Sequence, residues 1–457
     1  MPTIPARKLK GFRDLSGDLL ASRMEILEII RKEASLAAFQ WIDTPSLEYA
    51  ETLLGKGGDT DKQVYTFLDK GKREVALRYD LTMPFARFFA ENPTPYLPYR
   101  KVQVGKVWRA EKPQRGRYRE FVQCDFDIVG KDNVFEDMEI ITILVRCLYS
   151  CQLSHFTVSL GHRGILTYLL KHICHLHSPD VITQALIALD KLTKMGRDKV
   201  IGMLKELHIQ DIHIHTLLDA LQTKDKELEA LLLSLAKDSP TDSTSQDITR
   251  LLITLHHLRH IFSDTTSIQF VIDLSLARGL NYYTGIVFET TLQNLPEAGS
   301  ICSGGRYDLS GHFSKTLPPC VGGSIGVDRI VSSLQHTLSP PTTPPAVFLV
   351  GDLSSTVDIK THNLPTFLGL QRVAHILRNA GIAVQHCLDS KNISKQYKQA
   401  SKRSTAQHAL FIENVETLKD MKDKDILSCE VKHKNLTSTQ EITTTLKGFL
   451  KDQQSSK

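Results

Sequence analysis

The spacing of apolar residues divides the chain into segments with helical and strand-like periods. Residues 18–39 repeat apolar positions at intervals of three and four, which predicts an amphipathic helix. From Val75 to Ile128 the period changes to two, which predicts antiparallel sheet with a basic hairpin loop. The pattern is helical again over residues 181–260, and glycine-rich, strand-like segments resume over 268–328. We therefore expect one sheet domain in two stretches of sequence, separated by a helical insertion.

The clearest domain boundary is the segment SPPTTPP at residues 339–345, in which four of the seven residues are proline. This composition predicts a semi-rigid spacer. Beyond it, strand-like and helical runs alternate from AVFLVG to HALFIE, which indicates β-α-β units in a parallel or mixed sheet. The expected regions are a sheet domain at 1–175 and 262–335, an insertion at 176–261, a linker at 336–345 and an α/β domain at 346–457.

Composition narrows the class of protein without identifying it. With 457 residues, of which 41% are hydrophobic and 23% charged, the chain is typical of a globular protein with more than one domain, so disordered and collagen-like classes are excluded. The formal net charge of +5 is too small to show nucleic-acid binding. The eight cysteines are scattered, and no apolar run approaches the roughly 18 residues of a membrane span. We therefore expect a cytoplasmic protein that uses no membrane.

The strand after the basic loop has one polar face. Alternation places Phe121, Gln123, Asp125 and Asp127 on that face, while Val122, Cys124, Phe126 and Ile128 point the other way. The adjoining loop region carries Arg109, Arg115, Arg117 and Arg119. Guanidinium groups grip phosphate or carboxylate oxygens, so the hairpin suits a ligand with both cationic and anionic ends. A solvated edge hairpin with cross-strand ion pairs explains the same spacing equally well.

A second candidate segment is LARGLNYYTGIVFE at residues 276–289. Arg278 lies there between a strand and a glycine turn, beside Tyr282 and Tyr283. An arginine in that position could neutralise developing charge, and a tyrosine hydroxyl could recognise a polar side chain. Adjacent tyrosines are more often half-buried strand residues, so this reading stays open.

Two glycine-rich segments follow, SGGRYD at 303–308 and GGSIGVDRI at 322–330. Their glycines would let the backbone approach a ligand closely, and Arg329 is expected at the start of a helix. A plain turn is the default interpretation of a glycine pair.

The segment HICHLH, which holds His172, Cys174, His175 and His177, has the residue types of a metal site. Its spacing matches no zinc pattern, and no second pair of ligands lies nearby in the sequence. We therefore expect no metal ion held by protein side chains.

Taken together, these segments resemble the class II aminoacyl-tRNA synthetases, and among them the histidyl-tRNA synthetase family. The resemblance rests on the second class motif VGKVWRAEKPQRGRYREFVQCDFDIVG, on LARGLNYYTGIVFE, on SGGRYD and on the third motif GGSIGVDRI. LRYDLTMPFAR and the region of Pro45, similar to the dimer-forming first motif, extend it. It implies an antiparallel-sheet catalytic domain flanked by helices, with a helical insertion and a C-terminal α/β anticodon-binding domain.

The resemblance also implies which residues bind the substrates. For ATP these are Arg109 on the α-phosphate, Glu111 and Arg117 on the nucleotide phosphates, Phe121 on the adenine and Arg329 on the γ-phosphate. Asp80, Thr82 and Gln123 match positions that hold the α-ammonium group of histidine, and Asp127 and Tyr283 match those that read its imidazole nitrogens. Tyr282 and Arg278 complete the histidine site, and Arg278 and Arg109 are the implied catalytic residues.

The implied activity is ATP-dependent attachment of L-histidine to tRNA(His) through a histidyl-adenylate, with Mg²⁺ on the phosphates and a homodimer as the assembly. One departure is Asn281, where the common family pattern has aspartate. In the C-terminal region the segment ISKQYKQASKR is basic throughout, which favours phosphate contacts over a merely solvated lysine face.

Two alternatives remain. One is a paralogue of this family that keeps the fold as a regulatory or histidine-sensing subunit and lacks catalysis. The proline spacer, the α/β tail and Arg109, Arg278 and Arg329 argue against it. The other is a class II synthetase for a different amino acid, which RGLNYY and Asp127 disfavour.

Overall fold

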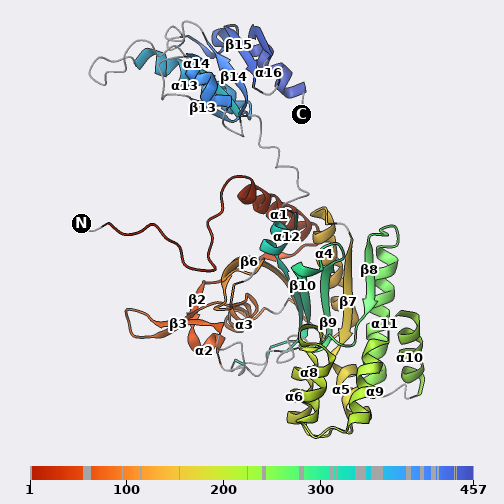
Figure 1. Cartoon of the computed structure of the whole chain (residues 1–457). Coiled ribbons are helices and arrows are strands. Elements are labelled where there is room, and N and C mark those ends of the chain that lie inside the picture. Colours follow the sequence, from red (N-terminus) through yellow and green to blue (C-terminus); the bar gives the residue numbers. More distant parts are fainter. Residues whose placement is uncertain are drawn as a thin grey trace. The chain divides into compact units, whose positions relative to one another are not determined.

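In the computed structural model, strands from distant parts of the sequence pair in one eight-stranded sheet with the order β1-β5-β6-β11-β10-β9-β7-β8 (Figure 1). The two edge pairs, β1–β5 and β7–β8, are parallel, and the pairs between them are antiparallel. The strands are β1 (Gln40–Trp41), β5 (Tyr99–Trp108), β6 (Glu120–Val129), β7 (Phe156–His162), β8 (Ile268–Ile272), β9 (Tyr283–Leu292), β10 (Ser300–Tyr307) and β11 (Cys320–Gly326). The prediction of one sheet built from two stretches of sequence is confirmed.

The chain divides into two units, Met1–Leu338 and Ser339–Lys457. The structure describes residues 3–54, 63–94, 96–113, 116–153, 155–223, 225–238, 243–276, 283–308, 312–313, 317–334, 346–350, 364–386, 393–401, 406–412, 418, 421–436, 438 and 440–455. The expected linker at 336–345 lies outside the described residues.

A second, three-stranded sheet corrects the expectation of continuous period-two structure from Val75 to Ile128. Strands β2 (Leu47–Tyr49), β4 (Glu74–Leu77) and β3 (Tyr65–Leu68) form it, beside the short helix α2 (Ala50–Leu53). Helix α3 (Thr82–Glu91) then interrupts the strand pattern before β5. The reason is that Met83, Phe85, Ala86, Phe89 and Ala90 are buried at helical spacing within a core of their own.

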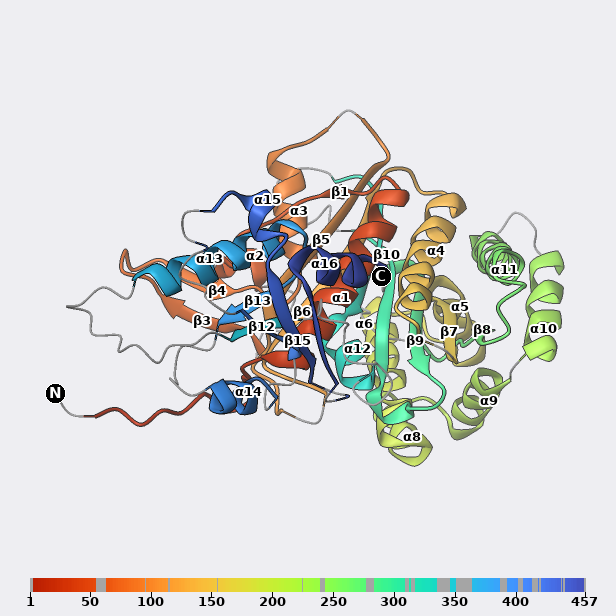
Figure 2. The ribbon, with the colours of Figure 1, turned by 90° about the horizontal axis from the view of Figure 1, so that it is seen from above.

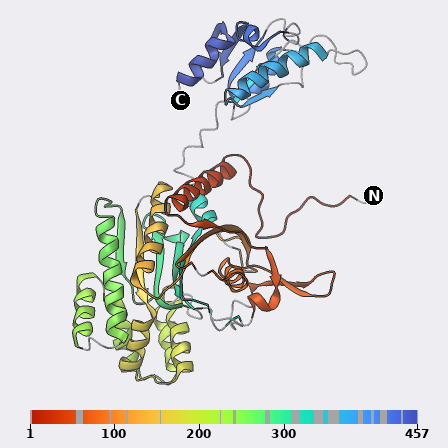
Figure 3. The same ribbon diagram turned by 180° about the vertical axis from the view of Figure 1, so that it is seen from behind.

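Helices cover one face of the large sheet. They are α1 (Gly17–Leu36), α4 (Val134–Ser150) and α12 (Val327–Leu334), which contact one another or the strands of this sheet (Figure 3). The apolar face of β6 is buried against them, and its residues there are Val122, Cys124, Phe126 and Ile128. The predicted alternation in β6 and the predicted first helix are therefore confirmed. Because the helices occupy this face, the polar side chains of β6 lie on the opposite one.

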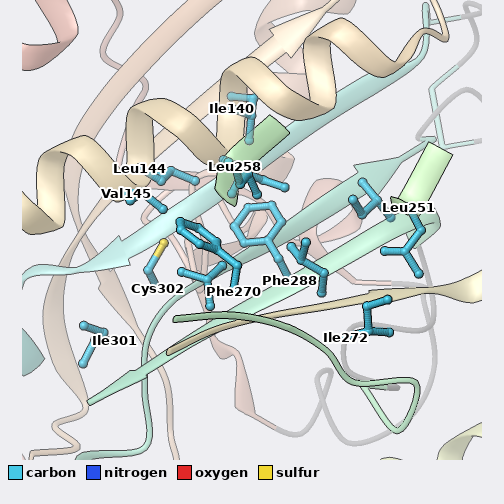
Figure 4. Close-up of a cluster of buried hydrophobic side chains, with 14 of the residues drawn as sticks. Ile140, Leu144, Val145, Leu251, Leu258, Phe270, Ile272, Phe288, Ile301 and Cys302 are labelled. Carbon is cyan, nitrogen blue, oxygen red and sulfur yellow. The ribbon is translucent and has the colours of Figure 1, made fainter. Parts of the chain in front are cut away.

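The expected helical segment consists of α6 (Pro179–Leu189), α7 (Leu192–Met195), α8 (Arg197–Lys205), α9 (Asp211–Gln222), α10 (Asp225–Asp238) and α11 (Ser243–Ile261), and it follows α5 (Arg163–Ile173). Helices α10 and α11 lie beside the edge strand β8 (Figure 2). Leu251 and Leu258 of α11 pack in one buried cluster with α4 and with Phe270 and Phe288 (Figure 4). Each such leucine contributes about 1.5–3 kcal/mol when buried, so the helical segment is joined firmly to the sheet.

A buried ion network adds to this attachment. Arg250 of α11 pairs with Asp132 at 2.6 Å and also with Asp137 of α4. Arg306 of β10 lies 2.8 Å from the same Asp137, which is fully buried. Because neutralising one member would leave a buried charge unpaired, these residues fix α11 and β10 relative to α4.

The C-terminal unit contains a five-stranded sheet with the order β13-β12-β14-β15-β16. Its elements are β12 (Ala346–Val350), α13 (Leu364–Asn379), β13 (Val384–His386), α14 (Ile393–Ser401), β14 (Ala406–Phe411), α15 (Asp423–Ile426), β15 (Glu430–Asn435), β16 (Glu441–Thr445) and α16 (Leu446–Ser455). Strand β12 is parallel to β13 and β14, and the remaining pairs are antiparallel, so the predicted mixed sheet is confirmed. Among the helices that the structure describes in either unit, none is both long enough and apolar enough to cross a bilayer.

Candidate active site

A cavity of about 300 Å³ opens on the face of the large sheet opposite α1, α4 and α12, a face that α3 covers in part. Its walls come from the β5–β6 hairpin, from β10 and β11, and from the first turn of α12. It is lined by Arg109, Glu111, Gly116, Arg117, Tyr118, Phe121, Gln123, Ser300, Ile301, Cys302, Ser303, Ser324, Gly326, Asp328 and Arg329. All five residues expected to bind ATP are in this lining, and so is Gln123. A volume of this size is within the usual range for small-molecule sites.

Arg109 is fixed by hydrogen bonds to two backbone carbonyl groups. It directly follows β5, and its backbone N–H donates to the carbonyl of Arg119 at 2.9 Å, which closes the hairpin. Its Nε donates to the carbonyl of Tyr79 at 3.0 Å, and its guanidinium carbon is 5.2 Å from the ring centre of Phe121. These contacts fix the direction of the guanidinium beside an aromatic face, which suits a planar base next to a phosphate.

The loop end of the hairpin carries a second charged pair. Arg117 lies 3.8 Å from Glu111, and both side chains are partly exposed. Arg119 Nε donates to the carbonyl of Glu111 at 3.0 Å, and the backbone N–H of Arg119 donates to the carbonyl of Gly11 at 2.9 Å. The N-terminal segment therefore supports the loop that carries these charges.

Asp328 anchors the same segment, and it was not among the residues expected in the site. Arg13 and Arg23 both donate to its Oδ1, and the backbone N–H of Val122 donates to its Oδ2 at 2.6 Å. The Arg13 guanidinium also lies 3.7 Å from the ring centre of Tyr118. The next residue, Arg329, donates to the carbonyl of Ser300 from its Nη1. One turn of α12 therefore ties the N-terminal segment, β6 and β10 to the cavity.

Sequence reasoning missed Tyr118, Ser300, Ser303, Ser324 and Asp328 as cavity residues. All except Ser300 lie inside the sequence motifs described above, so membership of a motif could have identified them as candidates. Ser300 lies in no motif. It reaches the cavity because β10 pairs with β9 and β11.

Beyond the cavity lining, Asp127 lies deep on the same face of the sheet. Its Oδ2 is 2.6 Å from Lys101 Nζ, and Tyr307 donates its hydroxyl to Oδ1 at 2.6 Å. All three side chains are almost completely buried. The Cβ position of Gly322, on the neighbouring strand, falls 1.9 Å from Asp127 Oδ1, so that only glycine leaves room for this carboxylate. Neither Lys101 nor Tyr307 was expected in the site.

Four of the other residues expected to bind histidine are described by the structure: Asp80, Thr82, Gln123 and Tyr283. Tyr283 is the register partner of Tyr307 across β9 and β10. Asp80 precedes α3, and its Oδ1 accepts a hydrogen bond from the backbone N–H of Met83 at 3.1 Å, while Thr82 is the first residue of that helix. Gln123 Nε2 donates to Ser324 Oγ at 2.8 Å at the border with the cavity. Asp80, Thr82, Asp127 and Tyr283 are outside the cavity lining itself.

Several expected residues cannot be located. Arg115, Arg278, Asn281 and Tyr282 lie outside the described residues, as do Lys391, Lys402 and Arg403 of the basic C-terminal segment. In the HICHLH segment, the ring of His172 lies 4.0 Å from that of Tyr168 in a tilted arrangement, and His175 contacts His213. Within the described part of the chain, no group of three or more histidine, cysteine or acidic residues has the arrangement of a metal site.

Asp125 lies between Gln123 and Asp127 on the same face and is buried. Its pKa is raised to about 7, mainly by burial; Lys101 lowers the pKa and the neighbouring Asp127 raises it, and both effects are included in that value. Its folded-state pKa is therefore above the ordinary value of 3.8. The folded protein therefore keeps the proton of this carboxyl group over a pH range in which the unfolded chain has lost it. Any contribution of the group to the free energy of unfolding is present in full below pH 4 and is lost as the pH rises toward 7.

We expect the substitution Asp125→Asn to raise the free energy of unfolding by about 1–3 kcal/mol at pH 8 and to change it little at pH 4. The amide resembles the protonated acid but carries no charge to bury. Urea unfolding between pH 4 and pH 8 measures the effect. Asp14→Asn, at a side chain that is 91% exposed, is the control and should be neutral. An Asp125→Asn protein that is less stable than the parent at pH 8 would contradict the assignment of a protonated carboxyl.

Comparison with known proteins gives consistent matches. A sequence model of the family described as histidyl-tRNA synthetase matches residues 11–330. The chain is 39% identical over 409 residues to a histidine–tRNA ligase of Rhodopirellula baltica, covering 88% of this chain and 89% of the relative. It is 34% identical over 469 residues to a histidine–tRNA ligase of Treponema denticola, covering 99% of both.

Solved structures agree with these matches. A histidyl-tRNA synthetase from a Nostoc species superposes with a TM-score of 0.78 at 26% identity, over 100% of both chains. A Bacillus halodurans structure described as an ATP phosphoribosyltransferase regulatory subunit/histidyl-tRNA synthetase has a TM-score of 0.70 at 23% identity, over 87% of this chain and 97% of that one. At that identity the second likeness is one of fold alone.

Proposed function

The chain belongs to the histidyl-tRNA synthetase family and is a histidine–tRNA ligase, and from this premise we propose how its own residues divide the reaction. The ligase uses ATP to activate histidine as an adenylate and then transfers it to tRNA(His). The observation that carries the proposal is the cavity lined by Arg109, Arg117 and Arg329. Its border residue Gln123 lies on β6, the strand that also carries the buried Asp127 four residues further on. Anionic and cationic groups of two substrates can be bound side by side there.

The guanidinium groups bind the nucleotide. Arg109 contacts the α-phosphate, Glu111 and Arg117 help to hold the nucleotide phosphates, and Arg329 contacts the γ-phosphate. Phe121 stacks on the adenine. The observed Arg109–Phe121 contact supports this division, since it brings a charge for phosphate and a flat face for a base into one wall.

Arg109 and Arg278 are the catalytic residues in this proposal. The carboxylate of histidine attacks the α-phosphorus, which brings two anions together, and pyrophosphate leaves. Fixed guanidinium groups lower that barrier because they need no reorganisation as the charge develops. The backbone contact of Arg109 with Tyr79 supports such preorganisation.

Histidine is held by the polar groups deeper on the sheet. Asp80, Thr82 and Gln123 bind its α-ammonium group, Asp127 and Tyr283 bind the two imidazole nitrogens, and Tyr282 completes the site. A site built to pair both ring nitrogens disfavours apolar side chains of similar size, which would leave buried polar groups without partners. The burial of Asp127 supports this role, because solvent competes little for its oxygens.

Mg²⁺ is the proposed second cofactor. Carboxylates in nucleotide sites usually contribute one or two ligands to a magnesium ion that the phosphates hold, and Glu111 lines this cavity with a partly exposed carboxylate. The residues present therefore fit an ion of this kind, and Glu111 is the residue that would help to hold it. Bound there, the ion would offset charge on the phosphates.

The proposal extends to the assembly and its partners. The C-terminal α/β unit binds the anticodon region, with Lys395 and Lys398 of α14 facing phosphates, and residues 176–261 act as an insertion domain distinct from the catalytic one at 1–175 and 262–335. The chain acts as a homodimer, which is the commonest closed assembly. It acts in the cytoplasm, and the free cysteines among the described residues support this location because disulfides are rare there.

Pyrophosphate exchange into ATP, measured with each of the twenty amino acids in turn, tests the function. We expect exchange with histidine alone. Exchange with another amino acid at a comparable rate would refute the specificity, and the absence of all exchange would favour a non-catalytic paralogue. Attachment of histidine to tRNA(His) transcripts in the same preparation separates activation from transfer.

A further inference from the structure

Lys101 is a lysine enclosed on all sides beneath the proposed histidine site. It lies on β5, directly opposite Asp127 of β6 in the strand register, and its side chain is 0% exposed. Its Nζ is 2.6 Å from Asp127 Oδ2 and 4.6 Å from the ring centre of Phe85. Burying an ammonium group is costly, so a lysine at such a position needs a charged partner. Asp127 is that partner.

Tyr307 completes the support of this carboxylate. Its hydroxyl donates to Asp127 Oδ1 at 2.6 Å, so each carboxylate oxygen contacts one group of the protein. Two contacts from different strands, β5 and β10, fix the carboxylate plane. Each oxygen retains a further lone-pair direction, which is what a substrate N–H needs.

Lys101 is in contact with one of two neighbouring carboxyl groups. Asp125 and Asp127 lie on the same face of β6, and both are buried. The lysine is in ion-pair contact with Asp127, whereas Asp125 is opposite Gln103 and Ser324 in the register. The ammonium group of Lys101 therefore orients the carboxylate of Asp127 and not that of Asp125.

We propose that Lys101 is a positioning and specificity-determining residue for histidine: its ammonium group holds the Asp127 carboxylate in the orientation that accepts the imidazole N–H of the substrate. Lys101 does not itself touch the substrate in this account. The inference rests on the proposed role of Asp127 in binding the imidazole ring.

A purely structural role would have different consequences. The contact of Lys101 with Phe85 attaches α3 to the sheet, and α3 follows Asp80. If that packing were the whole function, loss of the charge would lower thermal stability and would disturb both substrates. A positioning role changes the KM for histidine and leaves the KM for ATP as it was, because the nucleotide contacts come from the hairpin and α12.

The test is steady-state pyrophosphate exchange with Lys101→Met, which keeps the length of the side chain and removes the charge. We expect the KM for histidine to rise about 10- to 50-fold, as for loss of one charge-assisted contact, and the KM for ATP to stay within about twofold. Lys101→Arg should recover part of the loss. The matched control is Lys106→Met, on the same strand, where the lysine is 53% exposed and pairs with Glu120 at 2.9 Å; its constants should match those of the parent.

The inference would be overturned if Lys101→Met left the KM for histidine unchanged, or if it raised the KM for histidine and the KM for ATP by the same factor. If Lys101→Met does not fold, the double variant Lys101→Met/Asp127→Asn, which removes both charges, replaces it. Its KM for histidine should equal that of Asp127→Asn, and a further tenfold rise would show that Lys101 acts by another route. Failure of the proposed function is distinguishable, since then the parent protein itself shows no exchange with histidine.

Discussion

Replacement of Arg109 by alanine should slow the formation of histidyl-adenylate by about 10²- to 10³-fold. Its guanidinium is fixed by the carbonyl of Tyr79 at 3.0 Å and lies beside the ring of Phe121 at 5.2 Å. A fixed cation at the α-phosphate stabilises charge that develops only as the carboxylate of histidine attacks. Water that replaces it must reorient during the reaction, so the barrier rises. We expect the loss mainly in kcat, because the other phosphate contacts remain.

Single-turnover adenylate formation with saturating ATP and histidine measures this effect. Arg31→Ala is the matched control, because Arg31 is 57% exposed on α1 and pairs with Glu28 at 2.6 Å, away from the cavity. The control should have the rate of the parent protein. If Arg109→Ala kept the parental rate and only weakened ATP binding, the proposed catalytic role of Arg109 would be wrong.

The substitution Gly322→Ala should reduce kcat/KM for histidine by at least about 100-fold. The added methyl group would lie 1.9 Å from Asp127 Oδ1 and 2.8 Å from the carbonyl oxygen of Phe126. The carboxylate must then move away from Tyr307 and Lys101, or the two strands must separate locally. Either change removes the oriented acceptor for imidazole. We expect a lower unfolding temperature as well, since an overfilled site is strained.

Gly202→Ala provides the comparison, because nothing lies within 4 Å of the position where its methyl group would be. Gly202 lies inside helix α8 (Arg197–Lys205), where alanine is favoured over glycine by about 0.5–1 kcal/mol. This variant should be slightly more stable and fully active. Parental kcat/KM for histidine in Gly322→Ala would show that the tight space around Asp127 is not needed for recognition.

The family and most of the secondary structure could be read from the sequence because they depend on local order. In β6 the alternation of Val122, Cys124 and Phe126 with Gln123 and Asp125 is a property of successive residues, and burial on one face preserves it. Helix α3 was missed because it lies between two strands whose apolar residues repeat with a period of two. A periodicity measured over a window of residues cannot separate a short helix from strands that lie within a few residues of its ends.

The nucleotide side of the site was more predictable than the histidine side. Arg109, Glu111, Arg117 and Phe121 come from one hairpin, so proximity in sequence already places them together. Asp127 was expected, but its partners Lys101 and Tyr307 come from β5 and β10. Tyr307 is 180 residues away from Asp127 in the sequence. The pattern of residues within one segment of sequence cannot predict a contact between residues so far apart.

The sequence by itself determined the family, most of the strands and helices along the chain, and the residue types available for ATP and histidine. Only the tertiary structure decided which carboxyl group of β6 has a cation beside it, since that depends on the register of Lys101 against Asp127 across two strands. Burial raises the pKa of Asp125, and Asp127 has an ammonium group at 2.6 Å. The charge of a buried group is set by its neighbours in space, and these neighbours are fixed only when the sheet is assembled.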